Sequence, residues 1–329
     1  MNRRHFTIGA AVATIGLAGP GGRLQAQPAW TPNRPLRLVV SAAPGSTPDA
    51  TARPLAELMA QSLGQPVIVE NRPGAGGIVG IESVARATPD GYTMGLATQS
   101  QMVFNQHLFS KLPYDAVRDL QPVIRLASVA LVLAAHPSVP ADTFPELIKL
   151  ARARNLPLQI GVPLPGTPPH VVALLLQSEA GIRLESIPFK SGTDAVAACR
   201  SGDIPLILEA PPVVAPHVIA GRLKALAVTG SVREPILPNV PTVGEALGRS
   251  VSGETWFGLV LPQGTSPEVV ARLQRAAATA LARAELRKVY NDFGWRIIDG
   301  SSPSEFSAVI REEGPRWGEI IRKAGLKID

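Results

Sequence analysis

A buried strand, a Pro-Gly turn and a helix follow one another near the start of this chain, and the same succession of elements returns later. Residues 36–40 form an apolar, β-branched run that predicts a strand. Apolar residues then recur at helical spacing from Ala52 to Leu63, until Gly64 ends the pattern. Repeated strand–helix–strand units predict an α/β fold with mainly parallel sheets, whose ligands bind beyond the carboxyl ends of the strands.

The turn between this first strand and its helix carries hydroxyl side chains directly before the helix begins. Free backbone N–H groups and the positive end of the helix dipole favour an anion there, such as a carboxylate or phosphate. The candidate ligand contacts in this turn are Ser41, Ser46, Thr47 and Asp49. The alternative is that Asp49 only caps the helix and that the loop is a plain connector.

A second polar loop follows the third predicted strand, residues 92–97, at the same edge of the sheet. Its candidate contacts are Thr98, Gln99, Ser100 and the nearby Asn105. This loop would face the opening turn across the end of the sheet. Thr98 or Ser100 could instead serve as an ordinary helix cap.

The length of 329 residues exceeds one typical core and predicts two lobes. An apolar run over 123–135 indicates a strand crossing into a second lobe, and residues 253–261 indicate the return. We therefore expect residues 27–126 and 254–329 in the first lobe and residues 127–253 in the second. A hinge between the lobes would lie near residues 125–135 and 253–260.

A loop in the second lobe, residues 162–170, repeats the order of strand, proline-rich turn and helix. Its candidate ligand contacts are Gly166, Thr167 and His170. The prolines stiffen the loop, and a rigid loop loses less entropy when it binds a ligand. His170 could equally be a helix-cap residue at the edge of the lobe.

Two more second-lobe positions carry charged side chains. Lys190, Ser191 and Gly192 form a turn ahead of a helix, where a lysine suits a carboxylate or is simply solvated. Glu209 ends a predicted strand at the cleft edge. It could recognise a ligand amine or hydroxyl, or form a surface salt bridge.

The composition argues against several other classes of protein. The single Cys199 excludes an internal disulfide, and the five histidines lack metal-ligand spacing, so no metal is expected. The glycines of residues 74–80 do not match the dinucleotide-binding pattern, and no cofactor is predicted. No cluster of lysine and arginine suggests nucleic-acid binding.

The N-terminus reads as an export signal. Arg3 and Arg4 precede an apolar run over residues 6–17, and an A-x-A-like site predicts cleavage near Ala26. The paired arginines resemble a twin-arginine signal. Removing the signal, with Arg23, lowers the formal net charge from +6 to +3. We expect a soluble periplasmic protein.

Several segments, taken in order, resemble the Bug-type extracytoplasmic receptors of the tripartite tricarboxylate transporter family. The segments are Glu70-Asn-Arg-Pro-Gly-Ala-Gly-Gly77, Pro89-Asp-Gly-Tyr92, Ala225-Leu-Ala-Val-Thr229, Val240-Pro-Thr-Val243, Trp256 and Lys323-Ala-Gly325. The resemblance covers nearly the whole mature chain. It implies a two-lobed type II periplasmic binding protein that holds a ligand, typically a carboxylate, in a cleft between the lobes.

Carried onto this sequence, the resemblance points to first-lobe loops and second-lobe helix starts. The positions are Ser46, Thr47, Thr98 to Ser100, Asn105, Thr167 and Lys190 to Gly192. The chain departs from the family pattern at Ser46, at Ser191 and at Pro205, where the family has an acid. These departures surround the expected ligand and leave its identity open.

The predicted function is capture of a small organic carboxylate for a tripartite tricarboxylate-type transporter. The ligand could be a di- or tricarboxylate, an aromatic acid or an amino acid, and the partners would be membrane transporter subunits. We expect a monomer and no enzymatic activity. The alternatives are a ligand-sensing receptor without a transport role, and a secreted enzyme on the same scaffold, for which no nucleophile–base pair is visible.

Overall fold

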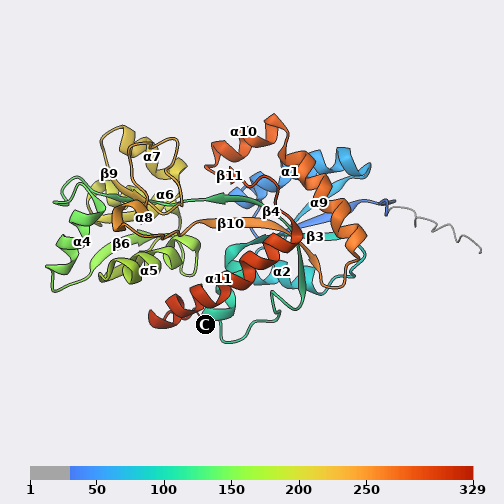
Figure 1. Cartoon of the computed structure of the whole chain (residues 1–329), viewed down its shortest axis with the longest axis horizontal. Coiled ribbons are helices and arrows are strands. Elements are labelled where there is room, and N and C mark those ends of the chain that lie inside the picture. The colour runs from blue at the N-terminus through green and yellow to red at the C-terminus, as the bar shows by residue number, and fades with distance from the viewer. Residues whose placement is uncertain (1–29, 329) are drawn as a thin grey trace, which may run out of the picture.

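The structure, a computed structural model, describes residues 30–328. The predicted export signal over 1–26, with its cleavage site near Ala26, lies outside these residues. The described chain forms two lobes that lie side by side along the long axis of the molecule (Figure 1). None of the helices in residues 30–328 combines the length and apolar character needed to cross a membrane.

The first lobe combines elements from both ends of the chain. They are β1 (Leu36–Val40), α1 (Thr47–Leu63), β2 (Val67–Asn71), η1 (Ala75–Gly77), α2 (Ile78–Ala85), β3 (Thr93–Thr98), η2 (Ser100–Phe104), α3 (Asn105–Leu108), β4 (Leu120–Val129), β10 (Thr255–Pro262), α9 (Pro267–Leu281), α10 (Ala284–Asp292), β11 (Arg296–Ile297) and α11 (Pro303–Lys323).

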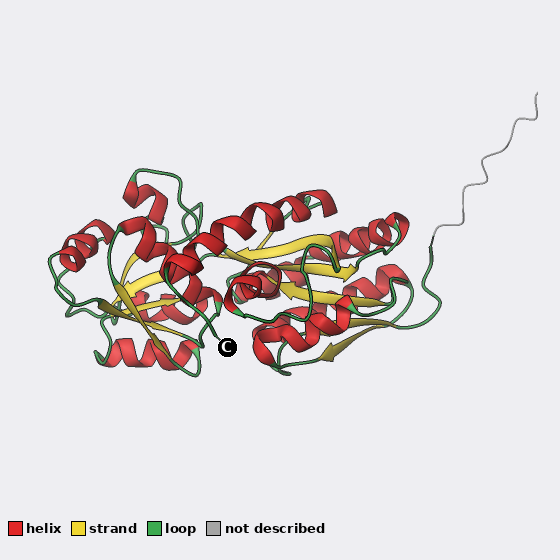
Figure 2. Cartoon of the chain, turned by 90° about the horizontal axis from the view of Figure 1, so that it is seen from below, coloured by secondary structure: helices red, strands yellow, loops and turns green. Residues whose placement is uncertain are grey.

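The second lobe is continuous in sequence. Its elements are β5 (Val132–Ala135), α4 (Phe144–Arg152), β6 (Leu158–Val162), α5 (Pro168–Ala180), β7 (Leu184–Pro188), α6 (Gly192–Ser201), β8 (Leu206–Glu209), α7 (Pro211–Ile219), β9 (Lys224–Val228) and α8 (Val243–Leu247). Helices flank the strands of both lobes (Figure 2).

Each lobe contains one mixed sheet. The strand orders are β11-β4-β10-β3-β1-β2 and β7-β6-β8-β5-β9. Strands that alternate with helices run parallel, as β1 does with β2 and β3, and β6 with β7 and β8. The prediction of mainly parallel sheets is modified by β10 and β5. Each arrives from the opposite lobe and runs antiparallel to both of its neighbours.

Two extended segments, near Leu131 and Gly253, connect the lobes, and Thr229 forms hydrogen bonds to both. The Thr229 N–H donates to the Leu131 carbonyl (2.9 Å), and the Gly253 N–H donates to the Thr229 carbonyl (2.7 Å). The Thr229 hydroxyl accepts from the Leu131 N–H (2.8 Å) and donates to the Gly253 carbonyl (3.0 Å). Both segments fall within the ranges where the sequence predicts a hinge, although β4 continues beyond residue 126 to Val129.

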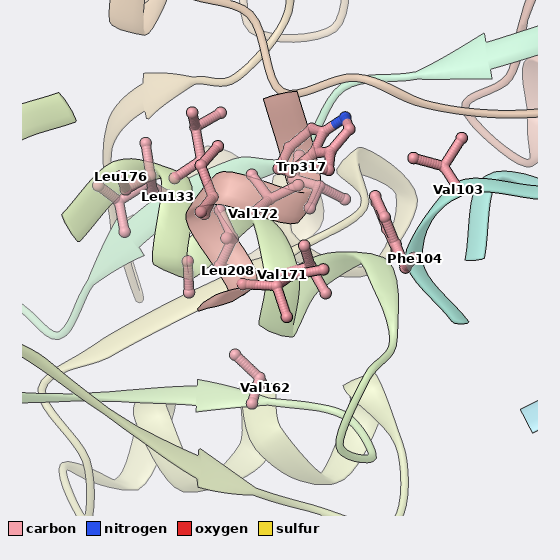
Figure 3. Packing of buried hydrophobic residues seen from close by; sticks show 14 of the residues in the cluster. Val103, Phe104, Leu133, Val162, Val171, Val172, Leu176, Leu208 and Trp317 are labelled. Carbon is pink, nitrogen blue, oxygen red and sulfur yellow. The ribbon is translucent and has the colours of Figure 1, made fainter. Parts of the chain in front are cut away.

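The last helix, α11, packs against both lobes. Its Trp317 meets Phe104 of the first lobe edge to face, with ring centroids 5.1 Å apart. Trp317 also belongs to the same buried cluster as Val171 and Val172 on α5 of the second lobe (Figure 3). The C-terminal helix, which the sequence assigns to the first lobe, also contacts the second.

Several helices begin with reciprocal side-chain caps. In α4 the Thr143 hydroxyl accepts from the Glu146 N–H, while the Glu146 carboxylate accepts from the Thr143 N–H. The same arrangement starts α11 with Ser302 and Glu305. Such caps satisfy backbone N–H groups that have no partner within the helix.

Candidate ligand-binding cleft

The starts of α1 and α5, one in each lobe, have the same local geometry. Their N-cap residues, Ser46 and Thr167, have nearly identical extended backbones, with φ and ψ of −72° and 163° and of −70° and 159°. The Ser46 hydroxyl donates to the Ala43 carbonyl, and the Thr167 hydroxyl donates to the Leu164 carbonyl, each at 2.6 Å. Both hydroxyls therefore shape their own loops.

The glycines before these caps complete the parallel. Gly45 and Gly166 have φ values of +78° and +74°, which side-chain-bearing residues rarely adopt. The Gly45 N–H donates to the Asp49 carboxylate (2.9 Å), and the Gly166 N–H donates to Nδ1 of His170 (3.2 Å). Burial lowers the pKa of His170, consistent with a neutral ring that accepts at Nδ1.

Asp49 anchors the first loop from within. Its side chain is 4% exposed and pairs with Arg53 (2.7 Å), and it also accepts from the Asn71 amide (2.9 Å). The Arg53 guanidinium, followed by the Gly45 and Asn71 N–H donors, holds the pKa of Asp49 below its usual value. Through these contacts Asp49 stabilises the conformation of the loop. Asp49 does not line the cavity between the lobes.

A cavity of about 320 Å³ lies between the lobes, within the range typical of small-molecule sites. We call it the interlobe cavity, and its lining is as follows: Thr47, Pro48, Thr98, Ser100, Val129, Leu131, Pro168, Pro169, Glu209, Ala210, Pro212, Val213, Thr255, Trp256, Phe293 and Trp295. It therefore joins the starts of α1, α5 and α7 to the ends of β3 and β8 and the crossing strand β10. Of the predicted site residues it brings together Thr47, Thr98, Ser100 and Glu209.

Some of the predicted hydroxyls already make hydrogen bonds within the protein, and others do not. Those of Thr47, Thr98 and Ser100 line the interlobe cavity and make no hydrogen bond to another residue in the described part of the chain. The backbone N–H of Thr47 also precedes the first intrahelical bond of α1, which the Ala50 N–H makes to Ser46 (2.8 Å). These donors remain available to a ligand.

Aromatic side chains form much of the remaining wall. Trp256 lies on β10, and Phe293 and Trp295 flank the turn between α10 and β11. Trp295 packs edge to face against Phe257, with centroids 4.5 Å apart. Phe293 and Trp295 were not among the predicted site residues, because their only sequence signal is an aromatic pair around a glycine.

Gln99 lies behind this wall. Its side chain is fully buried, and its Nε2 donates to the Glu313 carboxylate on α11 (2.8 Å). The Trp256 indole N–H donates to the same carboxylate oxygen (2.8 Å). Burial raises the pKa of Glu313. Gln99 and Glu313 thus support Trp256 from outside the cavity lining, and the sequence pattern did not indicate Glu313.

The other predicted residues lie outside the cavity lining. Asn105 is buried and donates to the Tyr114 hydroxyl (3.4 Å). Ser191 caps α6, and Lys190 beside it is exposed. The remaining predicted residues that do not line the cavity are Ser41, Ser46, Asp49, Gly166, Thr167, His170 and Gly192.

A second cavity of about 320 Å³ lies beyond Trp256, and we call it the hinge cavity. Its charged lining residues are Arg125, Glu254, Arg296, Glu313 and Arg316. Arg296 donates to both oxygens of Glu254 at 2.7 Å, and Arg316 donates to the Ser252 carbonyl. Arg296 and Glu254 pair with each other, and Glu313 and Arg316 bond to uncharged groups of the protein, so we regard this network as support for the connecting strands.

No group of three or more His, Cys, Asp or Glu side chains in residues 30–328 is arranged to hold a metal ion. Cys199 is fully buried, and burial raises its pKa to about 12. A protonated, enclosed thiol has little reactivity.

The two lobes, the connecting strands and the cavity between helix starts define a periplasmic binding protein fold. Residues 51–326 match the family described as "Tripartite tricarboxylate transporter family receptor", and the chain belongs to that family. The predicted resemblance is thereby confirmed. Protein BugT of Bordetella pertussis is 32% identical over 329 residues, which cover 100% of this chain and 99% of that one.

Solved structures agree with this assignment. The periplasmic binding protein BugD is 29% identical with a TM-score of 0.73, and the match covers 90% of this chain and 100% of BugD. R. palustris Rpa4515 with adipate is 29% identical with a TM-score of 0.76, covering 90% and 99% of the two chains. The two-lobed α/β fold predicted from the sequence is confirmed.

Proposed function

We propose that this chain is an exported solute-binding protein that captures a small organic carboxylate in its interlobe cavity for a tripartite tricarboxylate-type transporter. The observation that carries the proposal is the group of unpaired donors at the first-lobe end of the cavity. Thr47, Thr98 and Ser100 all line that end of the cavity, and the Thr47 N–H precedes the first intrahelical bond of α1. Donors of this kind bind a carboxylate without a compensating positive side chain.

The relative with adipate supports a carboxylate as the ligand class. Binding by hydroxyls and backbone amides requires no covalent step, and we propose capture rather than catalysis. The cavity lining, all within the described residues, contains one ionisable side chain, Glu209. A nucleophile–base pair needs two suitable groups within hydrogen-bond reach.

We propose that the two lobes close around the ligand. Thr229 bonds to both connecting segments and would make them move together. β4 ends at Val129 and β5 begins at Val132, so this crossing lies outside both sheets, and we propose that a change of backbone angles there lets the lobes rotate. We further propose that the mature protein begins near residue 27, works in the periplasm as a monomer and docks on membrane transporter subunits. The paired Arg3 and Arg4 favour the twin-arginine route of export.

Isothermal titration calorimetry of the purified mature protein tests the function. The panel contains dicarboxylates, tricarboxylates, aromatic acids and amino acids, with matched uncharged amides as controls. The proposal expects binding of at least one carboxylate and no binding of its amide. Failure of every class in the panel, with a protein shown to be folded, would overturn it.

A further inference from the structure

The two ends of the interlobe cavity differ in their chemistry. The first-lobe end presents the unpaired hydroxyls of Thr47, Thr98 and Ser100. The second-lobe end presents Glu209, the last residue of β8, which is 9% exposed. The cavity therefore has hydrogen-bond donors at one end and an acid at the other. A ligand with a negative group at the first end and a positive group at the second would complement it.

The Glu209 carboxylate is held in place and is only partly satisfied. Its Oε1 accepts from the Ala210 N–H (2.8 Å). Its Oε2 makes no hydrogen bond in the described chain and lies against Gly192, where an added Cβ would come within 2.4 Å of it. The Glu209 carboxylate thus lies between the interlobe cavity and the start of α6, where the missing side chain of Gly192 leaves room for it.

No positive side chain accompanies Glu209. The lining of the interlobe cavity, within residues 30–328, contains no lysine, arginine or histidine. Burial raises the pKa of Glu209 because a carboxylate in apolar surroundings without a cation is costly. A ligand that supplies a positive group would remove that cost.

The start of α7, next to Glu209, has no free backbone N–H groups that could bind an anion. Pro211 and Pro212 occupy the first turn of α7 and have no N–H, and the Val213 N–H bonds to the Ala210 carbonyl (3.1 Å). An anion at this end would meet Glu209 without compensating donors. The aromatic wall, in contrast, suits both an apolar body and a cation over a ring face.

We propose that Glu209 is a specificity-determining residue that selects zwitterionic ligands, which carry an ammonium group as well as a carboxylate, with an apolar or aromatic body. The ligand carboxylate binds the first-lobe donors, and its ammonium group faces Glu209 beside the aromatic wall. This inference rests on the proposed function, because it places the carboxylate at the first-lobe donors.

Calorimetry with matched pairs of ligands tests the inference without any substitution. Each pair consists of an amino acid and the same acid lacking the amine: L-phenylalanine and 3-phenylpropanoate, L-leucine and 4-methylpentanoate, L-glutamate and glutarate. The wild-type protein should bind the preferred amino acid about tenfold or more tighter than its partner. Equal or tighter binding of the acids without an amine would overturn the inference and leave the proposed function standing.

A variant then assigns the preference to Glu209. Glu209→Gln keeps the shape and removes the charge, and it should reduce the preference for the amine to within about twofold. Glu185→Gln, the same change at an exposed position on β7 of the same lobe, should keep it. Retention of the full preference by Glu209→Gln would also overturn the inference. Failure of all six ligands, with or without an amine, would overturn the inference, whereas the proposed function is overturned only if every class of the wider panel also fails.

Discussion

The indole N–H of Trp256 and the carboxylate of Glu313 are joined by a hydrogen bond of 2.8 Å that links the connecting strand β10 to the last helix. The same carboxylate oxygen accepts from Gln99, which follows β3. One buried acid therefore fixes an aromatic wall residue and the start of η2 beside it. The cavity depends on α11 even though that helix does not line it.

Replacing Glu313 should destabilise the protein. Glu313→Ala leaves the donors of Trp256 and Gln99 buried without an acceptor, at a cost of about 1–3 kcal/mol each. Glu313→Gln retains an acceptor and removes a buried charge, so its effect should be smaller. Urea denaturation measures both free energies of unfolding. An alanine variant as stable as the wild type would contradict the assigned role.

Removing an unpaired hydroxyl in the cavity should weaken ligand binding. Thr98→Val preserves the shape and deletes one donor, which should lower the affinity for the tightest carboxylate about tenfold. Thr93→Val is the matched control, because it makes the same change at the other end of β3, where the hydroxyl accepts from Arg37 (3.0 Å). Titration calorimetry compares the two variants, and equal losses of affinity would argue against a direct contact.

Asp49 should stabilise the protein in a pH-dependent way. Its pKa in the folded state lies below the usual value of 3.8, so its contribution is fully present above that pH and is lost as the pH falls through the folded pKa. Asp49→Asn should cost about 1–2 kcal/mol at neutral pH, because Arg53 is half exposed.

The free energies of unfolding of wild type and Asp49→Asn, measured by denaturant titration from pH 7 downward, should converge below pH 3.8. A difference that stays constant into strong acid would show that the loop loses something other than the ionised carboxylate.

The Thr229 hydroxyl should be needed for the coupling of the two connecting segments. Thr229→Val leaves the buried Leu131 N–H without the hydroxyl and costs about 1–3 kcal/mol. Thr265→Val is the control, because its hydroxyl bonds only to the Pro262 carbonyl within a first-lobe turn (2.8 Å). Small-angle scattering with and without ligand should show altered lobe closure in the hinge variant alone. Identical closure in all three proteins would exclude a hinge role.

The parallel between the helix starts of the two lobes could be predicted from the sequence, because both combine Pro-Gly, a hydroxyl and further prolines. Which hydroxyl lines the interlobe cavity could not be predicted. The hydroxyls of Ser46 and Thr167 donate to carbonyls in their own loops, whereas the Thr47 hydroxyl has no such bond and Thr47 lines the cavity. That division depends on backbone angles that a residue pattern does not specify.

The residues that the C-terminal part of the chain contributes to the cavity and its support could not be predicted from the sequence. Glu313 lies on a helix whose charged neighbours are mostly solvated, and it becomes buried only because α11 packs over β4 and η2. Phe293 and Trp295 reach the cavity because β11 pairs with β4. Each position depends on contacts between segments far apart in sequence, for which local periodicity gives no signal.

A crystal structure of the protein with its tightest carboxylate ligand is the most direct test of the account. We predict the ligand in the interlobe cavity, with its carboxylate within hydrogen-bond distance of Thr47, Thr98 or Ser100. A ligand bound instead in the hinge cavity, against Arg125 and Arg316, would contradict the account.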